Sequence, residues 1–126
     1  MNILGVDIGK KRTGLAWTDP AVGVVLPFGF FVSSPDQIAE KLGDIIKDER
    51  ITHVVIGLPL SPEGEENDAC VFVRQIGAAI TTAYNIEVFF EDERYTSRLA
   101  YSMGGEATKD EKAAMAILET YLHKKK

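Results

Sequence analysis

Three apolar runs with strand spacing open the chain, at residues 2–8, 13–18 and 23–33. Short polar turns separate them, and runs joined in this way are typical of antiparallel neighbours in one sheet. Pro27 and Gly29 interrupt the third run, and they indicate a bulged or edge strand because proline lacks the N–H that a central strand needs. The start of the sequence therefore predicts an antiparallel meander.

Helical spacing replaces strand spacing after the third run. Ser34, Pro35 and Gln37 fit a capped helix start, and apolar residues then recur on one face until a helix end near Asp48. The next segment, residues 53–58, is a nearly continuous apolar run, which is typical of a parallel strand buried on both faces.

The second half of the chain continues this alternation of helix and strand. A predicted loop over 59–66 is followed by a helix that Asn67 or Asp68 caps and Asn85 ends, and then by a strand over 86–90. A short helix is predicted to begin at Thr96 or Ser97 and to be broken at Gly104 and Gly105. A capping box of Thr108 and Glu111 begins the last predicted helix. The whole order predicts an α/β fold with a mixed five-stranded sheet, three antiparallel strands and then parallel strands, flanked by helices.

The bulk composition is that of an ordinary globular protein, with 45% hydrophobic and 26% charged residues. At 126 residues we expect one domain, over residues 1–126. No apolar stretch approaches the roughly 20 residues of a membrane helix, and the first residues do not resemble a signal peptide, so we expect no membrane contact. The single cysteine, Cys70, fits a reducing compartment and a cytoplasmic location.

Four carboxylates stand where ligands gather in such a sheet. Asp7 interrupts the otherwise apolar first strand, Asp92 and Glu93 follow the fifth strand, and Asp110 begins the last helix. Carboxylates brought together raise one another's pKa unless cations neutralise them, and Mg²⁺ and Mn²⁺ prefer such ligands. Two such ions suit phosphodiester hydrolysis. Structural roles are also open for these acids. Asp110 could interact favourably with the helix dipole, Asp92 could form a turn, and Glu93 and Asp7 could form ion pairs with nearby cations.

The net charge of −5 argues against general affinity for nucleic acid. The cations are nevertheless grouped near the acids: Lys10, Lys11 and Arg12 in the first turn, Arg94 and Arg98 after the fifth strand, and Lys109 before Asp110. A solvated surface explains these residues as well as a nucleic-acid surface does.

Four sequence blocks, taken in order, carry a resemblance to a known family. They are residues 6–16 (VDIGKKRTGLA), residues 55–60 (VIGLPL) with Gly64 after, residues 92–97 (DERYTS), and Asp110 followed by Ala113, Ala114, Ile117 and Leu118. In these blocks the chain resembles the YqgF (RuvX) family of Holliday-junction-resolvase-like nucleases. The resemblance implies a ribonuclease-H-like fold and an association with 5′-end processing of pre-16S ribosomal RNA.

The resemblance also implies roles for individual residues. Asp7, Glu93 and Asp110 would be the catalytic and metal-binding acids around Mg²⁺ or Mn²⁺, with Asp92 as a further candidate ligand. The residues expected to contact nucleic acid are Lys10, Lys11, Arg12, Arg94, Arg98 and Lys109, with Arg94 placed to hold a scissile phosphate.

Other functions remain open from the sequence. The first turn also resembles the phosphate loop of actin-like sugar kinases, although those proteins need two such domains. A Holliday junction resolvase acting on branched DNA would normally be a homodimer, and nothing in the sequence separates a monomer from a homodimer. A non-catalytic RNA-binding module of ribosome assembly fits the acidic net charge. We expect processing of a ribosomal RNA precursor before these alternatives.

Overall fold

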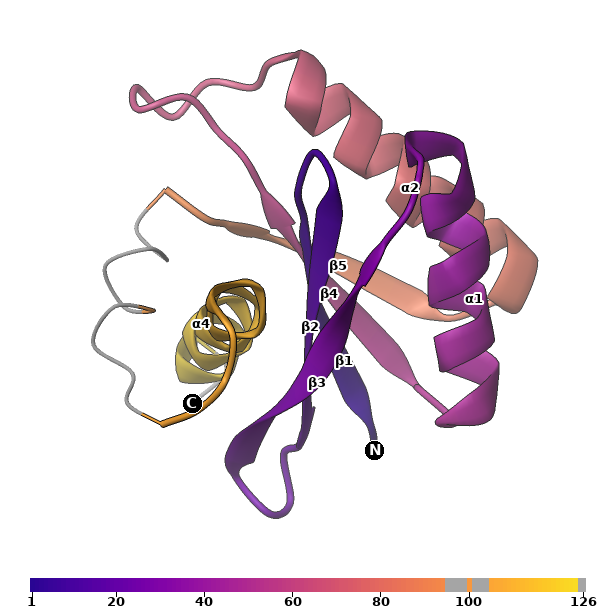
Figure 1. Ribbon diagram of the computed structural model, residues 1–126, viewed down its shortest axis with the longest axis vertical. Helices are drawn as coiled ribbons and strands as arrows, with labels where there is room; N and C mark the ends of the chain where they lie inside the picture. Colours follow the sequence, from indigo (N-terminus) through magenta and orange to yellow (C-terminus); the bar gives the residue numbers. More distant parts are fainter. Residues whose placement is uncertain (95–99, 101–104, 125–126) are drawn as a thin grey trace.

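A mixed five-stranded sheet forms the centre of the computed structural model, which describes residues 1–94, 100 and 105–124 (Figure 1). Its strand order is β3-β2-β1-β4-β5. The elements are β1 (Ile3–Ile8), β2 (Arg12–Asp19), β3 (Val24–Val32), a 3₁₀ turn η1 (Pro35–Gln37), α1 (Ile38–Asp48), β4 (His53–Leu58), α2 (Asp68–Tyr84), β5 (Glu87–Asp92) and α4 (Lys109–Lys124). The predicted ribonuclease-H-like arrangement of three antiparallel strands followed by parallel strands is confirmed.

Strand β1 is central, with β2 antiparallel on one side and β4 parallel on the other. The expected irregularity in β3 is present, because β3 is an edge strand whose register shifts where Leu15 and Ala16 face Gly29 and Pro27. The prediction for the fifth strand was wrong in its bounds. Strand β5 pairs with β4 as far as Asp92 opposite Leu58, two residues beyond the predicted end.

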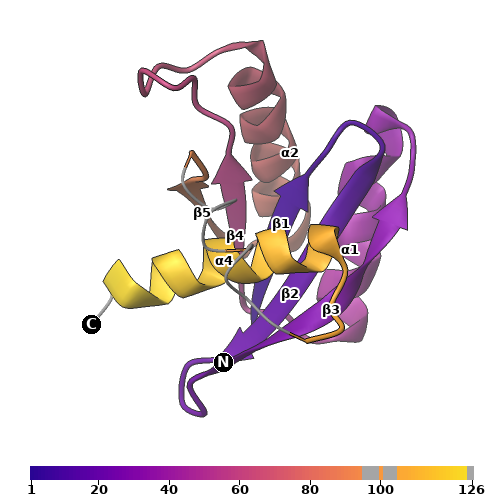
Figure 2. The ribbon, with the colours of Figure 1, turned by 60° about the vertical axis from the view of Figure 1, so that its left-hand side comes forward.

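Helices cover both faces of the sheet (Figures 1 and 2). Helices α1 and α2 pack together on one face, and α4 crosses the other. Side chains of β1 alternate between these layers, so Leu4 and Val6 join the core beneath α1 and α2, while Ile3 packs with Leu118 of α4. Asp7 shares the face of Ile3, which places its carboxylate on the α4 side.

Both predicted ends of α2 are present, whereas the capping box predicted at Ser34 is not. Asn67 accepts a hydrogen bond from the Cys70 N–H at 3.1 Å, and Asn85 ends α2 in the left-handed conformation. Ser34 makes no side-chain cap bond, and the segment after it begins as a 3₁₀ turn, so this capping box was a wrong prediction. The short helix predicted from Thr96 or Ser97 lies outside the described residues.

The packing also bears on the expectations about membrane and cysteine. In the parts of the chain that the structure describes, no helix is long and apolar enough to cross a bilayer. Cys70 is a free, buried thiol of α2.

Candidate active site at the end of the central strands

The side chains of Asp7 and Glu93 meet on the α4 face of the sheet. Asp7 lies near the end of β1, and Glu93 directly follows β5, where its N–H donates to the Leu58 carbonyl at 3.2 Å. The Glu93 carboxyl and the Asp7 carboxylate are hydrogen bonded to each other. The predicted convergence of acids at this end of the sheet is therefore realised for this pair.

Glycine in the intervening strand makes the contact possible. Strand β4 separates β1 from β5, so the Glu93 side chain must cross it to reach Asp7. Gly57 occupies the crossing point, and a Cβ there would overlap Glu93 Oε2 and approach the Ile117 side chain at 2.5 Å. Sequence reasoning missed this role. The available signal was a glycine inside a buried parallel strand, which often marks a close approach.

Both carboxyls of the pair have raised pKa values. The pKa of Glu93 is raised from 4.5 to about 8, chiefly by burial and further by the charge of Asp7, the hydrogen bond to Asp7 and the charge of Asp92. Burial also raises the pKa of Asp7, the hydrogen bond from Glu93 lowers it, and the charge of Asp110 raises it. At neutral pH the pair therefore holds a proton between its two carboxyls, a state typical of functional sites.

Asp110 approaches the pair from the first turn of α4. Gly14, which pairs with Asp7 across β1 and β2, lies directly beneath this turn, and a Cβ on Gly14 would overlap the Asp110 carbonyl oxygen. The Asp110 carboxylate lies 3.7 Å from Arg12 Nη1. Among the described residues, no three acidic, histidine or cysteine side chains already form a metal-binding group. Asp110 thus faces the pair without completing a ligand set with it.

The first turn of α4 is anchored by Glu111. Its Oε1 accepts the Thr108 N–H at 2.9 Å, and Thr108 Oγ1 accepts the Glu111 N–H at 3.1 Å, which confirms the predicted capping box. The other oxygen, Oε2, accepts the N–H of Gly29 at 2.7 Å. Glu111 therefore ties the start of α4 to the irregular part of β3 and fixes the backbone beside Asp110. The spacing of Thr108 and Glu111 predicts the cap, but no local pattern predicts the link to β3.

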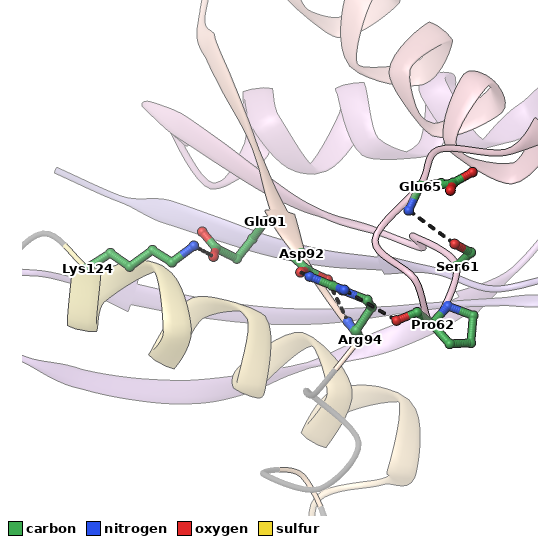
Figure 3. A network of polar contacts seen from close by, with 7 residues as sticks. All are labelled: Ser61, Pro62, Glu65, Glu91, Asp92, Arg94 and Lys124. Atoms are coloured by element: carbon green, nitrogen blue, oxygen red, sulfur yellow. Dashed lines mark hydrogen bonds and ion pairs between the residues drawn. The ribbon is translucent and has the colours of Figure 1, made fainter.

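Asp92 does not join the pair. Alternation along β5 puts Glu91 and Glu93 on the α4 face and Asp92 on the opposite face. Figure 3 shows Asp92 bound to Arg94, and the Nη2–Oδ2 distance is 2.7 Å. Hydrogen bonding from the Arg94 side chain lowers the pKa of Asp92, opposite to the shift at Glu93. The structure gives no support to Asp92 as a fourth ligand.

The predicted nucleic-acid-binding cations have different surroundings. Lys10 and Lys11 are exposed in the turn between β1 and β2, and Lys109 is exposed at the start of α4. Arg12 is exposed beside them and lies over the Phe30 ring, 5.7 Å from its centroid. Arg94 is half-buried in its contact with Asp92, and Arg98 lies outside the described residues.

The donor set at the pair suits a hard divalent cation. Its atoms are carboxylate oxygens, which hard divalent cations prefer. Burial is the largest cause of the raised pKa of both carboxyls, and the charge of Asp7 adds to it at Glu93, so a bound cation would favour their ionised forms. Asp7 and Glu93 are therefore the residues that would hold such a cation, and Asp110, whose charge raises the pKa of Asp7, is a further candidate ligand.

Comparison with known proteins gives close matches along the whole chain. A family model described as RuvX, Holliday junction resolvase, matches residues 1–124. A protein of Sulfurihydrogenibium sp. (strain YO3AOP1) named "Putative pre-16S rRNA nuclease" is 36% identical over 129 residues, covering 95% of this chain and 88% of that protein. A protein of Porphyromonas gingivalis (strain ATCC BAA-308 / W83) with the same name is 32% identical over 132 residues, covering 95% of this chain and 94% of that protein.

The fold has a solved counterpart. T. thermophilus RuvC, in complex with a Holliday junction substrate, matches with a TM-score of 0.67 and 13% identity, covering 99% of this chain and 95% of that chain. This likeness supports the ribonuclease-H-like fold. The family model and the identities with the two relatives show that the chain belongs to the RuvX family.

Proposed function

We propose that this chain, as one nuclease domain over residues 1–126, is a metal-dependent endonuclease that hydrolyses phosphodiester bonds in 5′-end processing of pre-16S ribosomal RNA. Family membership and the names of the relatives support the nuclease activity and the RNA substrate. The observation that carries the proposal is the contact between the Asp7 and Glu93 carboxyls, which lie together at the end of the central strands and both have raised pKa values.

Asp7 and Glu93 would hold Mg²⁺ or Mn²⁺, with Asp110 contributing from α4. A bound divalent cation of this kind lowers the pKa of its water and neutralises charge on the phosphate. The protein's own contribution is placement. Asp7 is fixed by its pairing with Gly14 of β2 and by the pairing of β1 with β4 up to the preceding residue. Glu93 is fixed by its backbone bond to Leu58 and by the space that Gly57 leaves.

The substrate backbone would be held by the turn between β1 and β2 and by the start of α4. Lys10, Lys11, Arg12 and Lys109 supply exposed or partly exposed positive charge there. Because the whole chain carries a net charge of −5, affinity must come from this local surface and not from the field of the whole molecule. Binding should then fall steeply with salt.

The test is a cleavage assay with two substrates side by side. A pre-16S ribosomal RNA 5′-leader fragment and a synthetic four-way DNA junction are incubated with the protein in Mn²⁺, in Mg²⁺ and in chelator. The proposal expects metal-dependent cutting of the RNA. Cutting that persists in chelator contradicts metal dependence.

Junction resolution is the second candidate, because the matching family model is described as Holliday junction resolvase. Symmetric cutting of two strands requires two active sites, so this function predicts a homodimer on the junction. Metal-dependent cutting of the DNA junction alone would establish it. If the protein binds RNA equally well in chelator and cuts neither substrate, it is a non-catalytic binding module.

A further inference from the structure

We propose that Arg94 is a positioning residue, which holds Glu93 and the β4–α2 loop in place, and that it does not bind the substrate phosphate. This inference deepens the proposed function and rests on it for the role of Glu93. The β4–α2 loop is defined here as residues 59–67, between β4 and α2.

The Arg94 guanidinium is already engaged by Asp92. Nε donates to Asp92 Oδ2 at 2.8 Å, and Nη2 lies 2.7 Å from the same oxygen. The backbone N–H of Arg94 donates to Asp92 Oδ1 at 2.9 Å. Both carboxylate oxygens of Asp92 are therefore used by Arg94, and the positive charge of the guanidinium is neutralised within the protein.

The same guanidinium reaches the β4–α2 loop. Figure 3 shows Arg94 between β5 and this loop, where Nη1 donates to the Pro62 carbonyl at 3.4 Å. Gly64 has a φ of +85°, and a Cβ on it would lie 2.9 Å from Arg94 Nη1. The loop thus leaves room for the guanidinium at the one position where its backbone also needs glycine.

The loop forms its own closed turn, which Arg94 attaches to the sheet. The Ser61 N–H donates to the Glu65 carbonyl at 2.9 Å, and the Gly64 N–H donates to the Ser61 carbonyl at 2.8 Å. The Glu65 N–H also donates to Ser61 Oγ at 3.1 Å, as drawn in Figure 3. Arg94 joins this turn to the end of β5, at the edge of the candidate active site.

Glu93 lies between Asp92 and Arg94 in the sequence, and their contact determines which face of the sheet the Glu93 side chain points to. Because Asp92 and Arg94 bind each other on the face opposite α4, the intervening side chain is directed to the α4 face, toward Asp7. The hydrogen bond that the Arg94 N–H donates to Asp92 Oδ1 closes a short turn around Glu93. Preorganised side chains of this kind keep a site within the narrow geometry that catalysis needs.

An arginine is required for these contacts. The planar fork places Nε and Nη2 on Asp92 while Nη1 reaches Pro62, whereas lysine has one ammonium group at the end of a flexible chain. A phosphate-binding cation, in contrast, keeps part of its function when arginine is replaced by lysine. The Arg94→Lys substitution therefore separates the two roles.

The experiment compares Arg94→Lys and Asp92→Asn with Lys11→Met, a control at an exposed cation of the β1–β2 turn. For the Arg94→Lys and Asp92→Asn proteins we expect kcat to fall about tenfold to a hundredfold with KM little changed. The slope of log affinity against log salt should stay as in the unsubstituted protein. Lys11→Met should instead weaken binding and reduce that slope by about one.

Hydrogen exchange gives a readout that does not depend on activity. The amides of Gly64 and Glu65 should exchange faster in both Arg94→Lys and Asp92→Asn, and the double variant should be no worse than either single variant. Unchanged exchange at these amides overturns the inference, even in a protein that cuts no substrate. Retained kcat with a raised KM in Arg94→Lys also overturns it, and assigns Arg94 to the phosphate. If the unsubstituted protein fails to cut but exchange responds as expected, the proposed function fails and the positioning role stands.

Discussion

Replacing Asp7 by asparagine should stabilise the metal-free protein at alkaline pH. Asp7 and Glu93 are hydrogen bonded and both have raised pKa values, so the folded protein holds two acids that would ionise more readily in the unfolded chain. Asparagine is similar in shape, carries no charge and can donate its amide N–H to the Glu93 carboxylate. The substitution therefore removes the repulsion and keeps the hydrogen bond.

The magnitude follows from the pKa of Glu93. Between 4.5 and about 8 the folded protein keeps a proton that the unfolded chain has lost, so the free energy of unfolding falls as pH rises through this range. At about 1.4 kcal/mol per pH unit, the whole effect is at most roughly 5 kcal/mol by pH 8. Burial, the largest cause of the raised pKa of Glu93, remains in the variant. The charge of Asp7 is removed, and the hydrogen bond now favours the ionised form of Glu93, because asparagine donates it. We expect Asp7→Asn to recover about 1–2 kcal/mol.

Urea unfolding at pH 5 and pH 8, in chelator, measures this difference. The unsubstituted protein should lose stability between the two pH values, and Asp7→Asn should lose less and exceed it by about 1–2 kcal/mol at pH 8. Asp44→Asn is the matched control, because Asp44 is an exposed acid of α1 and its replacement should change stability by no more than about 0.5 kcal/mol. An Asp7→Asn protein that is no more stable than the unsubstituted protein at pH 8 would refute the reasoning.

Three further predictions concern the surroundings of the pair. Gly57→Ala places a methyl group on the Glu93 carboxylate, so cleavage should be lost and stability should fall by about 1–3 kcal/mol; full activity in a cleavage assay contradicts the crossing role of this glycine. Glu111→Ala removes the bonds to Gly29 and Thr108 and should cost about 1–2 kcal/mol in thermal unfolding, and an unchanged midpoint would show that these bonds do not hold α4. Lys10→Ala should weaken RNA binding in fluorescence anisotropy and lower the salt slope by about one, whereas an unchanged slope places the RNA elsewhere.

Most of the sheet was predictable because burial dictates the residue pattern. The run over residues 53–58 has the composition of a parallel strand buried on both faces, and the structure pairs it on both sides. The carboxylate of Asp7 was conspicuous for the same physical reason, since an acid in such a strand needs a partner. Local chemistry alone was less reliable, as the absent cap at Ser34 shows.

The sequence could not predict which side chains from separate elements come into contact. Asp92 and Glu93 are adjacent acids, and only the register of β5 decides which of them faces Asp7. The predicted end of that strand at residue 90 left this choice open. A glycine inside a buried strand indicates a close approach, but not its partner: Gly14 makes room for the Asp110 backbone and Gly57 for the Glu93 side chain, and both partners come from distant parts of the sequence. Such roles depend on which elements pack together.

The most direct test of the central claim is the single-turnover cleavage rate of the Asp7→Asn protein in saturating Mn²⁺. The substrate is the one that the unsubstituted protein cuts, and binding is measured in parallel. The account predicts that binding persists and that cleavage falls to the background seen in chelator, because the pair no longer offers two carboxylates. Cleavage by the Asp7→Asn protein at the unsubstituted rate would show that the chemistry takes place without this pair.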